Sequence, residues 1–223
     1  LVTDNFKNIT EILRSLHITH TDAILADLGW RQDQFTDGGM GFSFMNDEPL
    51  HMTFGEPGDY DYTAYDIVNT WAEDSIADII FGYGEERAAR KIAQAIVIRR
   101  KRNPIKTTKE LVECIESVVR RDKKSKINPA TKTFQALRIA VNDELSVLET
   151  FLKDSFASLS PGGRMSIISF HSLEDRVVKH YFKNLVEAEL ATAITKKPIT
   201  PSGYELANNP RARSAKLRVI EKL

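Results

Sequence analysis

The sequence is poor in cysteine, with one residue, Cys114, among 223. A single thiol excludes an intramolecular disulfide and a zinc site built from cysteines. Cys114 lies at a helical core spacing in the segment LVECIESVV, which predicts a buried structural thiol rather than a nucleophile. No apolar run approaches the roughly 20 residues that span a bilayer, and no secretory apolar segment stands at the start. We therefore expect a soluble, cytoplasmic protein.

Several catalytic motifs are also missing. The sequence has no HExxH, no GxSxG and no paired cysteine and histidine set, which excludes the common zinc protease, serine hydrolase and zinc deaminase classes. A glycine-rich stretch at 38–41 precedes Phe42-Ser-Phe44 instead of a helix with lysine, so it does not predict a phosphate loop. No metal site is expected.

The chain lacks a net charge, with 31 basic and 31 acidic residues, but the two signs are unevenly distributed. Residues 1–86 hold 17 acidic and 3 basic residues, whereas residues 87–223 hold 14 acidic and 28 basic residues. Such asymmetry can mark a nucleic-acid surface, or the segments can interleave in space and cancel. From composition alone, we slightly favour a mixed surface on which the positive and negative charges cancel.

The hydrophobic pattern predicts an α/β protein interrupted by helices. Apolar runs at 22–29 and 162–170 suit buried parallel strands, and residues 217–223 alternate like a third strand. Capping-box signatures predict helix starts at Thr63, Thr107 and Ser172, with Asp66, Glu110 and Asp175 as their partners. An apolar stripe predicts one long helix from Thr131 to about Phe151. A mostly helical stretch, 45–128, separates the first strand from the later elements.

Polar side chains follow two of the predicted strands. Ligands of open α/β sheets bind outside the carboxyl ends of the strands, where Asp27 ends the first strand and Ser169 and His171 end the second. Asp27 is either a ligand acceptor or an aspartate that caps the next turn. His171 is either a base or substrate contact, or a histidine satisfied by backbone groups at the strand-to-helix junction, and we favour the second interpretation.

Two basic clusters are candidates for contact with RNA phosphates. Residues 99–102 read RRKR, and a second cluster near the end of the chain contains Arg211, Arg213, Lys216 and Arg218. Clustered cations bind phosphates by releasing counterions, although most such runs are solvated helix ends.

Longer motifs give a resemblance that extends over almost the whole chain. The sequence resembles the bacterial ribosomal RNA small-subunit methyltransferase H family, also called MraW, in the following segments: 5–8 (NFKN), 27–44 (DLG…Q…GFSF), 64–71 (AYDIVNTW), 83–87 (YGEER), 128–145 (NPATKTFQALRIAVNDEL), 169–176 (SFHSLEDR) and 209–218 (NPRARSAKLR). Several of these motifs are long, and they occur in the family's order.

The resemblance implies a class I, Rossmann-like methyltransferase core dependent on S-adenosylmethionine, with an inserted helical domain. The core would comprise residues 1–44 and 129–223, and the insertion, 45–128, would recognise RNA. The implied reaction methylates N4 of a cytidine in 16S rRNA of the small ribosomal subunit. Its implied site comprises Phe6, Asp27 and Gln34 as cofactor contacts, Asp27 as the catalytic acceptor, and His171, Arg211, Arg213 and Lys216 as RNA contacts. A homodimer is a further expectation.

The target cytosine must be unstacked to react. Phe42, Phe44 and Trp30 are candidates to hold it between aromatic rings, and core packing is the alternative for each. With a ribosomal substrate implied, we favour a polarised surface over a cancelled one.

The sequence departs from the family's pattern near the expected methyl-transfer site. Arg31 and Gln32 replace serines, Asp33 replaces a proline, and His51, Thr53 and Gly55 replace two acids and an arginine. The family's glycine-rich cofactor loop and an acidic residue lie upstream of Leu1, so we expect the printed chain to be N-terminally truncated and to bind S-adenosylmethionine weakly. The alternatives are a non-catalytic RNA- or ribosome-binding homologue and a methyltransferase that acts on another RNA.

Overall fold

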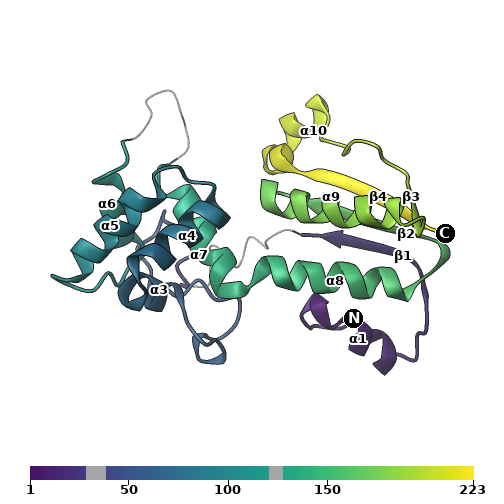
Figure 1. Ribbon diagram of the computed structural model, residues 1–223, viewed down its shortest axis with the longest axis horizontal. Coiled ribbons are helices and arrows are strands. Elements are labelled where there is room, and N and C mark those ends of the chain that lie inside the picture. Colours follow the sequence, from purple (N-terminus) through teal and green to yellow (C-terminus); the bar gives the residue numbers. More distant parts are fainter. Residues whose placement is uncertain (29–38, 121–127) are drawn as a thin grey trace. The chain divides into compact units, whose positions relative to one another are not determined.

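A computed structural model describes residues 1–28, 39–120 and 128–223 of the chain (Figure 1). The chain forms two compact units. The first, the α/β unit, comprises Leu1–Gly29 and Glu144–Leu223, and the second, the helical unit, comprises Trp30–Asp143.

The α/β unit is built on a mixed sheet of four strands in the order β1-β2-β4-β3. The strands are β1 (Thr21–Asp27), β2 (Leu159–Ser169), β3 (Ala191–Ala193) and β4 (Lys216–Lys222). β1 and β2 are parallel, whereas β4 is antiparallel to both β2 and β3. The three strands expected from the sequence are confirmed, while the short β3 was not predicted.

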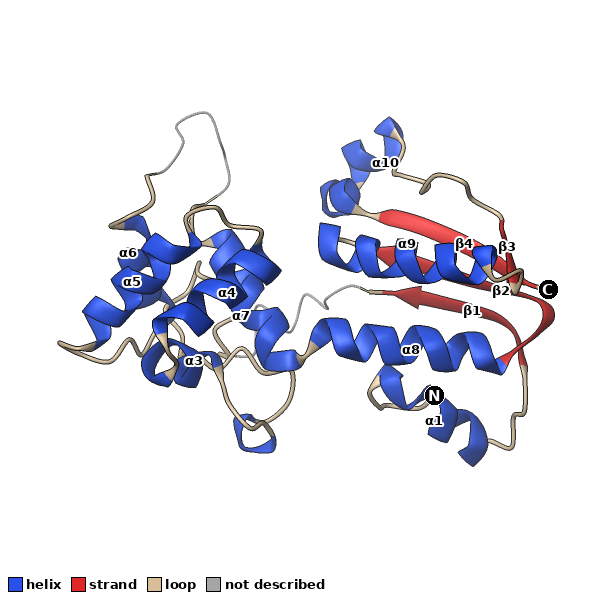
Figure 2. Cartoon of the chain, viewed as in Figure 1, coloured by secondary structure: helices blue, strands red, loops and turns tan. Residues whose placement is uncertain are grey.

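Two long helices, α8 (Glu144–Ser158) and α9 (Ser172–Glu187), pack against one face of this sheet (Figure 2). Register places Ile24, Met165 and Ile220 side by side, so alternate residues of three strands face the helices. The buried cluster consists mainly of Leu148, Phe151, Leu152, Phe156, Met165, Ile167, Val178, Phe182 and Ile220. The unit also contains η1 (Phe6–Asn8), α1 (Ile9–Ser15), α10 (Gly203–Asn208) and η3 (Pro210–Ser214).

The helical unit contains η2 (Pro57–Asp59), α3 (Ala64–Thr70), α4 (Glu73–Gly84), α5 (Ala89–Arg100), α6 (Thr108–Glu116) and α7 (Thr131–Asn142). The predicted capping boxes at Thr63 and Thr107 are both present. Cys114 is 7% exposed, which confirms a buried thiol. In the described ranges, no helix combines the length and the apolar character needed to cross a membrane.

The single helix predicted from Thr131 to about Phe151 is wrong. α7 ends before Asp143, whose left-handed backbone (φ 47°, ψ 40°) separates it from α8. Aspartate is one of the few residues that adopt this conformation at low cost, and hydrophobic periodicity does not reveal it. The apolar stripe consequently serves two cores, because Phe134 and Leu137 pack in the helical unit and Leu148 packs against the sheet.

The helical unit is also longer than the expected 45–128. Phe42 is buried in its core, and α7 contributes Phe134, Leu137 and Val141. The compact helical unit accordingly spans Trp30–Asp143.

Candidate functional site

The carboxyl edge of the sheet gathers the polar residues that the sequence places after two strands. Asp27 ends β1 opposite Ile168 of β2, and the backbone N–H of Leu28 donates to the Ile168 carbonyl at 2.9 Å. β2 ends one residue later, at Ser169, and His171 follows. Because β1 and β2 are parallel, the exposed carboxylate of Asp27 and the start of α9 lie at the same edge, as expected.

His171 is the N-cap of α9. Its Nδ1 accepts a hydrogen bond from the Glu174 backbone N–H at 3.3 Å. In return, Oε2 of Glu174 accepts from the backbone N–H groups of Phe170 at 2.9 Å and His171 at 3.2 Å. The predicted box between Ser172 and Asp175 is therefore wrong by one residue. His171 is satisfied in part by backbone, which agrees with the interpretation that we favoured.

The other ring nitrogen of His171 lies beside the carboxylate of Glu174. Nε2 lies 3.1 Å from Oε1 of Glu174, although the angle falls outside hydrogen-bond geometry. Glu144, the first residue of α8, supplies a second carboxylate, and one ligand atom from each of the three side chains lies within 4.8 Å of the others. These distances alone would suit a cation.

The capping bond favours a proton over a metal ion at Nε2. Nδ1 accepts a hydrogen bond from a backbone N–H, so this nitrogen carries no proton. A neutral imidazole then carries its one N–H proton on Nε2. A protonated Nε2 has no lone pair for a metal. The chemistry of this cluster is therefore that of a histidine N–H close to a glutamate carboxylate and without a hydrogen-bond partner among the described residues.

Behind this cluster, Asp175 joins α9 to β4. Its carboxylate accepts hydrogen bonds from Nε and a terminal nitrogen of Arg218 at 2.7 and 3.2 Å, and from Nζ of Lys216 at 3.0 Å. Burial raises the pKa of the Asp175 carboxyl, but the hydrogen bonds and positive charges of Arg218 and Lys216 outweigh burial and hold it below its usual range. Lys216, a predicted RNA contact, is thus already paired with a carboxylate.

The remaining predicted RNA contacts, Arg211 and Arg213, lie exposed in the short helix η3. Phe6, a predicted cofactor contact, begins η1 and is 42% exposed. Its ring packs edge-on against Phe151 of α8, with the ring centroids 5.0 Å apart. Gln34, the other predicted cofactor contact besides Asp27, lies outside the described residues.

The aromatic candidates for holding a base belong to the helical unit. Phe42 is 8% exposed and stacks on Phe54 with the ring centroids 5.5 Å apart, and Phe44 packs edge-on against Phe134 at 5.3 Å. Core packing is therefore the role that the structure shows for Phe42 and Phe44. Trp30 lies outside the described residues.

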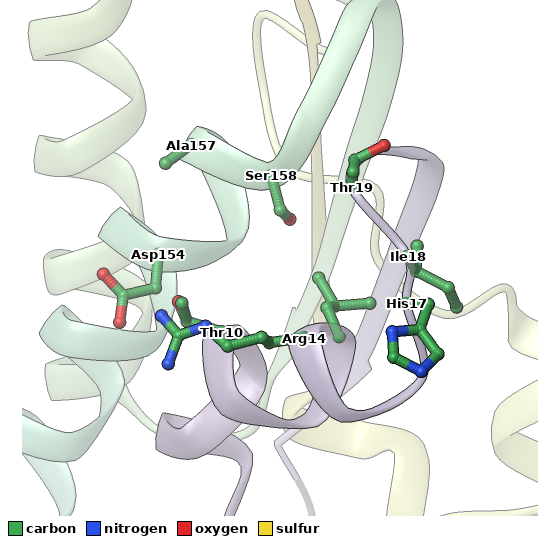
Figure 3. A pocket seen from close by; sticks show the side chains of 9 residues that line it. Thr10, Arg14, His17, Ile18, Thr19, Asp154, Ala157 and Ser158 are labelled. Atoms are coloured by element: carbon green, nitrogen blue, oxygen red, sulfur yellow. The ribbon is translucent and has the colours of Figure 1, made fainter.

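A separate cavity of about 530 Å³ lies between α1 and the end of α8 (Figure 3). Its polar lining includes Arg14 and Asp154, whose side chains point toward one another. Ile18 and Ser158 of this cavity stand just before β1 and β2, at the amino edge of the parallel strands. Ligands of α/β sheets bind at the opposite edge, so we place the functional site with Asp27.

Sequence reasoning missed both glutamates of the cluster. A capping box is recognised in a sequence by serine or threonine at the N-cap. Because the N-cap of α9 is His171, the sequence pattern did not indicate Glu174 as its partner. Glu144 reaches the site only because a helix begins there, after the unpredicted break at Asp143.

Comparisons with known proteins show the family to which the chain belongs. A family model described as "MraW methylase family" matches residues 1–223. Three curated relatives carry the name "Ribosomal RNA small subunit methyltransferase H". That of Coprothermobacter proteolyticus is 46% identical over 222 residues, covering 100% of this chain and 73% of the relative. That of Brevibacillus brevis is 44% identical over 239 residues, covering 100% and 76%. That of Deinococcus radiodurans is 44% identical over 218 residues, covering 98% and 68%. With a family match over its whole length and relatives of this similarity, the chain belongs to the MraW methylase family.

Proposed function

We propose that this protein methylates the RNA of the small ribosomal subunit, at the exocyclic N4 of a cytidine, with S-adenosylmethionine as the methyl donor. Membership of the MraW methylase family and the names of the relatives support methylation of small-subunit rRNA. The motifs that resemble the family's support the finer choice of N4 and of the donor. A ribosomal substrate in turn supports a cytoplasmic location.

The observation that carries the proposal is the exposed Asp27 carboxylate at the carboxyl edge of the parallel strands β1 and β2. This edge is where Rossmann-like sheets bind nucleotide cofactors. A carboxylate acceptor fits the hydroxyl and amine donors of an adenosine-containing cofactor. We therefore propose a class I core in which Asp27, Phe6 and Gln34 hold the cofactor. The proposal includes contact of the helical unit with RNA and assembly of the protein as a homodimer.

Bound S-adenosylmethionine supplies an electrophilic methyl group on a sulfonium. The protein then needs no nucleophile of its own, and its contribution is to position the amine and to stabilise charge. Asp27 accepts a hydrogen bond from the attacking exocyclic amine and takes up the proton that the amine loses. Positioning of this kind requires a rigid edge, and the capping bonds of His171 and Glu174 fix the strand-to-helix turn beside Asp27.

All four predicted RNA contacts keep that role in the proposal, but their surroundings differ. Arg213 is exposed and can reach phosphates directly, and Arg211 is exposed as well but already has a partner within the protein. Lys216 would meet a phosphate only together with Asp175, which holds its Nζ at 3.0 Å. His171 would act through its Nε2 proton.

The test of substrate class is methyl transfer from radiolabelled S-adenosylmethionine by the complete gene product. Small subunits, large subunits, transfer RNA and ribosomal proteins would be offered separately. We expect label only in the RNA of the small subunit. Label in another RNA would support the alternative substrate. Binding to small subunits without any transfer would support the non-catalytic homologue, which the replacements at His51, Thr53 and Gly55 motivate.

A further inference from the structure

The longest stretch of purely positive charge lies in the helical unit. Residues 87–109 contain nine basic and no acidic residues. Part of this charge is already used inside the protein, because Arg100 donates to the carbonyls of Val68 and Trp71 at 2.8 and 2.6 Å, and Arg99 donates to the Asn103 carbonyl. In the cluster 99–102, where the sequence suggested an RNA contact, Arg100 therefore joins α5 to the end of α3, and Arg99 binds the turn that follows α5.

The beginning of α5 is different. A cavity of about 770 Å³ lies between the end of α4 and the start of α5, and its lining includes Phe81, Arg87, Arg90 and Lys91. We call it the Phe81 hollow. Phe81 is 64% exposed although it is a large apolar side chain. The three cations are exposed, and none makes a hydrogen bond or ion pair with the residues that the structure describes.

Two acids also line the Phe81 hollow, and one of them is engaged. Oε1 of Glu86 accepts a hydrogen bond from the Ala88 backbone N–H at 2.8 Å, and its Oε2 lies 3.9 Å from Nζ of Lys132. With Glu86 engaged, the lining of the hollow has one remaining acid, Asp78, and three cations. The net charge of the hollow is therefore positive. The first turn of α5 adds the positive end of the helix dipole.

An exposed aromatic ring beside cations matches the chemistry of single-stranded RNA. Bases stack on exposed rings without regard to sequence, and cations nearby track the phosphates. The neighbouring Gly82 leaves open space, since a Cβ at that position would meet no atom within 4 Å. A protein interface would instead favour an apolar centre with few charges.

We propose that the Phe81 hollow binds single-stranded RNA, with one base stacked on Phe81 and the backbone phosphates held by Arg87, Arg90 and Lys91. The proposal deepens the proposed function, because it rests on RNA as the substrate and assigns a place where that RNA is held. It lies apart from Asp27 in sequence and belongs wholly to the helical unit.

The test is fluorescence anisotropy with a fluorescein-labelled, single-stranded RNA of 12 nucleotides and mixed sequence, titrated with the complete gene product. Phe81→Ala is expected to weaken binding about 5- to 100-fold, the range for loss of one stacking platform. The control is Ile98→Ala, which removes an apolar side chain 53% exposed on α5 and should leave Kd within about two-fold. Circular dichroism checks that each variant folds.

A second pair of variants tests the cations. The double variant Arg90→Ala with Lys91→Ala is expected to lower the slope of log Kd against log salt by about 1.4, two phosphates at about 0.7 each. Its charge-matched control, Lys101→Ala with Arg102→Ala, changes two exposed cations just beyond α5. Equal losses in both double variants would overturn the proposal, because the binding would then follow total charge alone.

The same variants separate this proposal from the proposed function. If Phe81→Ala binds RNA like the wild type, the Phe81 hollow is not an RNA site, even where small-subunit rRNA is methylated. If Phe81→Ala loses RNA binding while the wild type methylates no rRNA, the hollow stands and the proposed function fails. Binding of small subunits that Phe81→Ala weakens, without any binding of free RNA, would show that the hollow does not bind single-stranded RNA and would overturn the proposal.

Discussion

The carboxylate of Asp175 is the best place to test how the α/β unit is held together. It is 8% exposed and accepts three hydrogen bonds from Arg218 and Lys216, across more than 40 residues of sequence. The change Asp175→Asn keeps the size of the side chain and removes the charge. It leaves the guanidinium of Arg218, whose side chain is 13% exposed, without a counterion.

The magnitude follows from burial. Removing one partner of a buried ion pair costs about 3–5 kcal/mol, and the asparagine keeps a carbonyl oxygen that can accept one hydrogen bond. We therefore expect a loss of about 2–4 kcal/mol in the free energy of unfolding of the α/β unit. Hydrogen exchange followed by mass spectrometry measures this unit separately, and amides of β4 should exchange about 30- to 1000-fold faster.

Two controls accompany this measurement. Glu221→Gln breaks another ion pair of β4, between Glu221 and Arg164 of β2 at 2.8 Å, whose side chains are 31% and 60% exposed. An exposed pair of this kind contributes about 0–1 kcal/mol, so exchange should change little. Amides of α4 and α5 belong to the other unit and should be unaffected. A loss below about 0.5 kcal/mol in Asp175→Asn would refute the reasoning from burial.

The pH dependence of the same difference has a definite sign. The pKa of Asp175 is lower in the folded protein than in the unfolded chain, where it is about 3.9. A depressed pKa gives stability that is present above the unfolded value and is lost as pH falls through the folded value. The gap between the wild type and Asp175→Asn should thus be full at neutral pH and shrink below about pH 4. A gap that grew on acidification would contradict the assignment.

Two further predictions concern the helical unit. Gly84→Ala should cost about 1–3 kcal/mol in urea unfolding, because its Cβ would meet the Lys132 carbonyl oxygen at 2.6 Å. Gly82→Ala, on the same helix but with open space around it, should instead stabilise by about 0.5–1 kcal/mol, and equal effects would contradict the close approach of α4 and α7. Burial raises the pKa of the Cys114 thiol to about 11, so Ellman's reagent at pH 8 should react about 100 times more slowly with the folded than with the unfolded protein. Reaction at the unfolded rate would show that Cys114 is accessible.

Secondary-structure elements with a regular local sequence pattern could be predicted from the sequence. Alternation and apolar runs identified β1, β2 and β4, and the parallel pairing of the first two brought Asp27 and His171 to one edge. The threonine signatures located the starts of α3 and α6 correctly.

Single residues with unusual roles could not be predicted in this way. The left-handed backbone of Asp143 divides one periodic stripe between two cores, and a histidine replaces the expected serine as the N-cap of α9. The pairing of Asp175 with Arg218 depends on the neighbouring positions of α9 and β4, which no local pattern contains. Local sequence also does not show which cations are left to bind a ligand. Arg100 donates to a carbonyl of α3, whereas Arg90 on the same helix is exposed.

The central claim is that Asp27 serves the methylation of a cytidine N4 in small-subunit rRNA. The most direct measurement is mass spectrometry of nucleosides from small-subunit rRNA, in a bacterium that lacks its own family member and expresses the complete gene product. We expect N4-methylated cytidine to appear with the wild type and with Asp22→Ala, which removes another exposed carboxylate of β1, and to be strongly reduced with Asp27→Ala. Undiminished methylation in Asp27→Ala would remove Asp27 from the mechanism, and absence of the modified nucleoside with the wild type would contradict the proposed function itself.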